Sequence, residues 1–255
     1  MSEGTFLAIA LSHLEAIELP DIPLPLVAFD KIDEGRLFFG VRYYVYASIA
    51  HVRKILRGLV QVSDEANWAC ANVLARHLME WAAHATFLKV KLPSLLRSKQ
   101  LDEAWAMLLQ LNGGDMYFRR YGAKYLESGT PSVEIPNPIK VKALFNVYDQ
   151  EHAATDGRGS SQEDYSLLSE LSHASAACMR RCMETRENRI VFCAGDDDDS
   201  PLPIASASTI DWILSIGELL SLISDTMVAP KVISAIREIS ESGAPGNNSR
   251  EGYIS

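Results

Sequence analysis

Three side chains that can carry charge or bind a proton follow one another at four-residue spacing in the segment Ala66–Leu88, whose other residues are apolar, small or neutral polar. Arg76 and Glu80 are the only charged residues of this segment, and His84 comes one turn later. On a helix, this spacing places all three on one face, where the two charges can pair. Burying a charge costs several kcal/mol unless the charge is paired and hydrogen-bonded. The segment therefore predicts a buried polar stripe, and we expect Glu80→Ala to cost about 3 kcal/mol or more of stability.

A second segment, Tyr165–Met179, has Glu170 as its only charged residue. Its polar side chains also recur at helical spacing, with Ser166 four residues before Glu170 and Ser169 four residues before His173. If this helix packs on the first one, Glu170 or His173 would complete a buried network. Two interpretations remain open. The network fixes the register of two core helices, or it forms a site, because perturbed charges cluster at functional sites.

A metal centre is a weaker interpretation of the same residues. Glu170 and His173 have the spacing used by ferritin-like di-iron sites, and Glu80 with His84 could face them. Such sites need a second Glu-x-x-His helix, whereas Glu80 and His84 are four residues apart. The pair Cys178 and Cys182 lacks a second pair at zinc spacing. We therefore expect no metal ligands and no cofactor, and a di-metal oxidase stays as an alternative.

The segments Ala75–Glu80 and Tyr165–Ser175 together resemble the two signature helices of a widespread bacterial family of unknown function. That family has an Arg-x-x-x-Glu helix and a Tyr-x-x-Leu-Ser-x-x-x-His helix. The resemblance implies an all-helical fold distantly similar to HEPN domains, plausibly a homodimer, and no established activity. The shared residues that it implies are Arg76, Glu80, Ser169 and His173.

A divergent HEPN-like ribonuclease, as used in toxin or phage-defence systems, is the main enzymatic alternative. HEPN ribonucleases place a histidine on the same helix as an arginine, after four to six intervening residues. Here seven residues separate Arg76 from His84, and no histidine follows the later arginines Arg180, Arg181, Arg186 and Arg189. The sequence departs from the nuclease pattern at both places.

Helical periodicity dominates the chain, and its breaks fall at prolines and glycines. The predicted helices are Thr5–Leu19, Arg36–Val60, Ser63 or Asp64 to Val90, Ser94–Leu111, Asp115–Glu127, Ile139–Ala154, Gln162–Arg189, Ser206–Val228 and Pro230–Ser242. A short strand at Ile190–Phe192 is an alternative. We expect an all-α fold, a single bundle of seven to nine helices over residues 31–242. Residues 1–30 would form an N-terminal helix and an extended segment, and residues 243–255 a disordered tail.

The composition narrows the class of function. The 255 residues are 47% hydrophobic and carry 33 acidic against 24 basic side chains, a net charge of -9. An acidic surface makes nucleic acid an unlikely partner, because phosphate binding needs clustered Lys and Arg. Three acidic residues interrupt the most apolar segment, Ile210–Met227, which argues against a membrane span. We expect a cytoplasmic, non-catalytic interaction or sensing module of bacterial or mobile-element origin, homodimeric and able to bind a protein partner.

Overall fold

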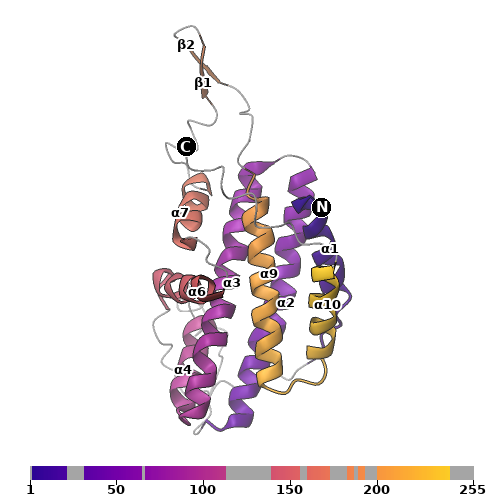
Figure 1. Cartoon of the computed structure of the whole chain (residues 1–255), viewed down its shortest axis with the longest axis vertical. Coiled ribbons are helices and arrows are strands. Elements are labelled where there is room, and N and C mark those ends of the chain that lie inside the picture. The colour runs from indigo at the N-terminus through magenta and orange to yellow at the C-terminus, as the bar shows by residue number, and fades with distance from the viewer. Residues whose placement is uncertain are drawn as a thin grey trace, which may run out of the picture.

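The computed structural model describes residues 2–21, 32–64, 67–112, 139–155, 160–172, 183–186, 189–192 and 200–241. Within these ranges the chain forms eight helices and one two-stranded hairpin (Figure 1). The elements are α1 (Glu3–Glu15), α2 (Glu34–Asp64), α3 (Trp68–Arg97), α4 (Leu101–Asn112), α6 (Val141–Thr155), α7 (Ser161–Ser172), β1 (Met183–Arg186), β2 (Arg189–Phe192), α9 (Leu202–Leu222) and α10 (Ala229–Glu241). The predicted all-α bundle is confirmed. The expected helix at Asp115–Glu127 and the tail at 243–255 lie outside the described residues.

Helix α3 lies at the centre of the bundle, as its scarcity of charged residues predicts. It packs against α2, α4, α6, α7 and α9 (Figure 1). Several of its fully buried positions are alanines, which let neighbouring helices approach closely; these are Ala71, Ala75, Ala82, Ala83 and Ala85. Thr86 Oγ1 lies 3.1 Å from Ser215 Oγ of α9, so two buried hydroxyls satisfy each other across the contact.

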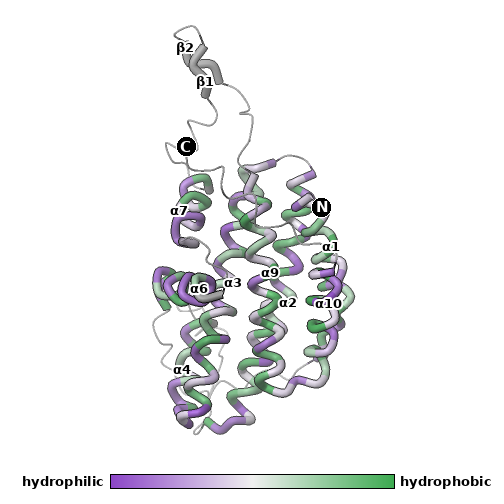
Figure 2. The backbone as a smooth tube through the Cα atoms, viewed as in Figure 1, coloured by the Kyte–Doolittle hydropathy of each residue, from purple (hydrophilic) through white to green (hydrophobic). Residues whose placement is uncertain are grey.

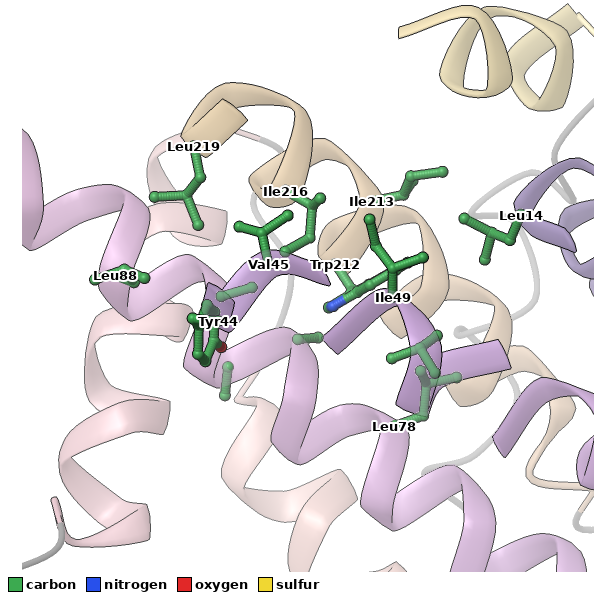
Figure 3. Packing of buried hydrophobic residues seen from close by; sticks show 14 of the residues in the cluster. Leu14, Tyr44, Val45, Ile49, Leu78, Leu88, Trp212, Ile213, Ile216 and Leu219 are labelled. Atoms are coloured by element: carbon green, nitrogen blue, oxygen red, sulfur yellow. The ribbon is translucent and has the colours of Figure 1, made fainter. Parts of the chain in front are cut away.

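One continuous hydrophobic core joins the long helices. Figure 3 shows side chains of α1, α2, α3 and α9 meeting there, among them Leu14, Tyr44, Ile49, Leu78 and Trp212. Burying a side chain of this size contributes about 1.5–3 kcal/mol. Hydrophobic and hydrophilic residues are interspersed along the helices (Figure 2), as expected where each helix has a buried and a solvent-facing side.

Helix α1 is held in the bundle by apolar burial and by two arginines of α2. Its buried residues are Phe6, Leu7, Ala10 and Leu14. Arg53 Nε donates to the Leu14 carbonyl at 2.9 Å, and Arg53 also donates to the Ile17 carbonyl. Arg57 pairs with Glu15. The basic stretch of α2 thus donates hydrogen bonds to free carbonyl groups at the C-terminal end of α1, and its positive charge is favourable at that end of the helix.

Helices α9 and α10 are joined by a buried aspartate. Asp225 Oδ1 accepts hydrogen bonds from the backbone N–H groups of Met227, at 3.0 Å, and Val228, at 2.8 Å. Its Oδ2 accepts from Arg42 Nε at 2.7 Å and Tyr46 Oη at 2.8 Å, both from α2. These bonds outweigh the opposing effect of burial and lower the pKa of Asp225.

None of the described helices is long and apolar enough to cross a bilayer.

Several predicted boundaries around α3 are wrong. The helix begins after Asn67, whose side chain accepts from Cys70 N, while Ser63 and Asp64 belong to α2. It continues through Pro93 to Arg97, since burial of Leu88 and Leu92 in the bundle outweighs the local cost of the proline. The break before α4 falls instead at Lys99, whose φ of 57° is left-handed and ends a helix.

The predicted long helix at Gln162–Arg189 is also wrong in its second part. Helix α7 ends at Ser172, and residues 183–186 form β1, which pairs antiparallel with β2. The alternative strand at Ile190–Phe192 is confirmed within β2. Thr185 lies opposite Ile190 in this hairpin, and such β-branched residues favour extended backbone.

The close approach of α2 and α4 requires a glycine at position 40. A Cβ there would lie 2.5 Å from Cζ3 of Trp105, a rigid ring. We expect Gly40→Ala to destabilise the fold by about 1–3 kcal/mol, although alanine favours a helix by roughly 1 kcal/mol. Urea denaturation followed by circular dichroism measures this change.

Gly58, on the same helix, is the matched control. A Cβ there would lie 3.0 Å from a terminal methyl of Leu74, which can rotate away. Gly58→Ala should therefore stay within about 1 kcal/mol of wild type. Equal losses in the two variants would contradict the close packing of Trp105 on Gly40.

Candidate functional site

The predicted pairing of Arg76 with Glu80 is confirmed, and a tyrosine of α7 joins it. Arg76 Nε lies 3.4 Å from Glu80 Oε1. Tyr165 Oη donates to the same oxygen at 2.8 Å, and the Arg76 guanidinium lies 5.3 Å from the centre of the Tyr165 ring. Helices α3 and α7 therefore pack against each other, as expected if the second polar helix completes the stripe. Burial, followed by the hydrogen bond to Glu80, raises the pKa of Tyr165.

The ion pair is less buried than predicted. The side chains of Arg76 and Glu80 are 27% and 26% exposed, so both keep contact with water. The reason is their place on α3, at the edge of its contact with α7. Solvent weakens the attraction and also lowers the cost of breaking it. The pair fixes where α7 docks on α3. The loss of stability of about 3 kcal/mol or more expected for Glu80→Ala is too large for a pair that is this exposed.

His84 continues the stripe and is half-buried one turn beyond Glu80. Burial lowers its pKa to about 4; the Glu80 carboxylate opposes this shift, and His77 adds to it. The Trp81 ring centre lies 6.2 Å from that of His84. His84 is therefore a neutral imidazole at pH 7, held against an apolar surround.

The remaining predicted site residues belong to α7 or follow it. Ser169 is half-buried. Glu170 is exposed and lines a depression on the outer face of α7 together with Ser166 and Leu167, which contradicts its predicted place in a buried network. His173 lies outside the described residues, as do Cys178 and Cys182.

A pair of histidines beside the stripe was not among the predicted site residues. His51 Nε2 of α2 lies 3.2 Å from His77 Nε2 of α3. Their ring centres are 5.2 Å apart, and the Trp81 ring lies 5.2 Å from that of His51. Burial, then the nearby His77 and Lys54, lowers the pKa of His51. The spacing of His77, Trp81 and His84 marks one face of α3, but nothing in the sequence places His51 opposite it.

A second unpredicted cluster is centred on Asp211 of α9, which is 3% exposed. Its Oδ2 accepts a hydrogen bond from Tyr148 Oη and lies 3.5 Å from His152 Nε2, both on α6. Nearby, Lys89 of α3 lies 2.7 Å from a carboxylate oxygen of Glu151. An aspartate inside an apolar helix was a visible signal in the sequence. Its partners were not, because they come from a separate helix.

These groups offer acid–base chemistry and hydrogen bonding. Within the described ranges no group of three or more His, Cys, Asp or Glu side chains is arranged to hold a metal ion. Comparisons found no protein-family model, no curated protein and no solved structure that matches this chain.

The contact of Tyr165 with Glu80 gives a first test of this site. Tyr165→Phe removes one hydrogen bond and keeps the ring on Arg76, so it should cost about 1 kcal/mol. Glu80→Ala removes both contacts and should cost about 1–2 kcal/mol. Urea denaturation measures both values. Because Tyr165 acts on Glu80, the double variant should lose little more than Glu80→Ala alone, and additive losses would contradict the contact.

The low pKa of His84 gives a second test. As the pH falls below about 6.5, the unfolded chain takes up a proton at this histidine, whereas the folded chain resists until about pH 4. The free energy of unfolding should therefore fall across this window, by at most roughly 1.4 kcal/mol per pH unit from this group. His84→Gln should show a shallower fall than wild type between pH 7 and pH 4.5. Parallel pH profiles would show that His84 is solvated.

Proposed function

We propose that this chain is a helical interaction or sensing module that works as a homodimer and has no catalytic activity of its own. The observation that carries the proposal is an apolar groove of about 460 Å³ between α3, α9 and α10. Two large apolar side chains in its lining, Leu214 and Ile233, are 42% and 43% exposed. Exposed apolar side chains that share one groove are typical of protein-binding surfaces.

A polar pair in the lining supports binding of another helical surface. Lys89 and Glu218 also line the groove, with Lys89 Nζ 3.5 Å from a Glu218 carboxylate oxygen. Protein interfaces commonly combine apolar contacts with polar groups of this kind. A second copy of the chain brings the same groove, so a two-fold contact would bury Leu214 and Ile233 of both copies.

The polar stripe supports a positioning role. Arg76, Glu80 and Tyr165 bond to one another across the contact of α3 with α7. Groups held in this way set the position of α7 on the central helix α3. The resemblance of these two helices to a bacterial, distantly HEPN-like family of unknown function is in keeping with such a module.

Light scattering during size exclusion tests the dimer. Ile233→Asp places a charge in the groove, so the wild-type dimer should become a monomer without loss of helicity by circular dichroism. Val73→Asp is the matched control, since Val73 is 47% exposed on α3 and is not among the residues lining the groove. A monomeric wild type would contradict the homodimer, and a dimer in Ile233→Asp would contradict the groove as its interface.

An RNA assay tests the absence of catalysis. Wild type and Arg76→Ala are incubated with total cellular RNA, and the products are separated by size. We expect no cleavage above the buffer control in either sample. Cleavage by wild type that is lost in Arg76→Ala would replace this proposal by the HEPN-like ribonuclease.

A further inference from the structure

We infer that His51 and His77 form a binding site for a divalent transition-metal ion that prefers imidazole, such as Ni²⁺, Cu²⁺ or Zn²⁺. The inference concerns a single protomer and is independent of dimerisation. It starts from the distance of 3.2 Å between the two Nε2 atoms, which belong to different helices. Imidazole nitrogen is the commonest protein ligand for ions of this class.

The distance suits two ligands of one ion. With metal–nitrogen bonds of 2.0–2.1 Å, tetrahedral ligands lie about 3.3 Å apart and adjacent square-planar ligands about 2.9 Å. The observed separation falls between these values. A hydrogen bond between two neutral imidazoles gives a similar distance, so the geometry alone permits both and the experiment must separate them.

The surroundings favour access by an ion from solution. His77 is exposed and His51 is half-buried, so the gap between them opens to water. Water molecules would complete the coordination, since the two imidazoles are the ligands that this place supplies. The charged residues near the two histidines have opposite signs, so their effects on a bound cation oppose each other. Lys54 follows His51 by three residues, and Glu80 follows His77 by three. Glu80 is engaged with Arg76 and Tyr165 and is not counted as a ligand.

An ion at this place would link α2 to α3. Two ligands on separate helices hold an ion more tightly than either alone, because the fold already holds the second near the first. The link also stabilises the folded state in proportion to the ion concentration. Affinity and thermal stability must therefore change together, and each requires both histidines.

Calorimetric titration with Ni²⁺ at pH 7.5 tests the site. We expect one ion per chain for wild type, and affinity weaker by roughly tenfold or more in both His51→Gln and His77→Gln. The double variant should show no binding at this place, since each single variant keeps one imidazole and the double variant keeps neither. His77 is exposed, so His77→Gln tests the site without disturbing the core.

Two controls make the outcome specific. His13→Gln removes a histidine that pairs with Glu238 instead, and Cys70→Ser removes an exposed thiol, so neither should change the affinity. Ni²⁺ should raise the melting temperature of wild type and not that of His77→Gln. It should also quench tryptophan fluorescence in wild type, and much less in Trp81→Phe, because Trp81 lies beside His51.

The inference is overturned if wild type binds no Ni²⁺ below roughly 100 µM, a free energy near 5.5 kcal/mol. It is also overturned if His77→Gln binds as tightly as wild type. In either case the two rings share a hydrogen bond only. These results leave the dimer untouched, since that proposal depends on the groove at Ile233 and not on the face of α3 that meets α2.

Discussion

The contact between α3 and α9 is the interaction on which the rest of the bundle depends. The first two-thirds of α3 carries two charges and a series of buried alanines, so water must be excluded from most of its surface. Helices α2 and α9 cover two sides of it along its length, and α4, α6 and α7 cover most of the remainder (Figure 1). The large apolar side chains come mainly from the covering helices, with Trp212 of α9 fully buried. Small residues on the central helix and large ones around it allow the helices to pack closely.

Polar contacts then decide where each shorter helix docks. Tyr165 of α7 bonds to Glu80, Tyr148 of α6 bonds to Asp211, and Arg53 of α2 bonds to the end of α1. Apolar surface is poor at specifying such positions, because it is non-directional. A half-buried hydrogen bond contributes only about 1 kcal/mol, but it is lost if a helix slides by one turn. Helices α1, α6 and α7 are thus each held in register on a long helix by a hydrogen bond from a tyrosine or an arginine.

The sequence predicts features that depend on the spacing of residues within one helix. It does not predict contacts that depend on which helices pack together. The four-residue spacing of Arg76 and Glu80 predicted their pairing, and the scarcity of charges predicted the central place of their helix. Residue spacing does not show how far a helix face is buried, so it did not predict that about a quarter of the Arg76 and Glu80 side chains is exposed. Local preference predicts a helix end before Pro93, whereas tertiary packing extends α3 to Arg97. His51 and Asp211 contact partners on other helices, and a single sequence does not show which residues of different helices lie close together.

The histidine pair and the ion pair lie on neighbouring lines of α3 and are electrostatically one cluster. His84 lies within reach of both: burial is the main cause of its low pKa, Glu80 acts to raise that pKa, and His77 acts to lower it. A positive charge at His77 would therefore also act on His84. It would act on Glu80 as well, and so on the hydrogen bond that Tyr165 donates to Glu80 and that holds α7 in place. Low dielectric around half-buried groups makes such coupling stronger than it would be in water. Helix α3 carries few charged or titratable side chains, and they gather where it faces α2 and α7: His77 lies beside His51 of α2, and Arg76 and Glu80 contact Tyr165 of α7.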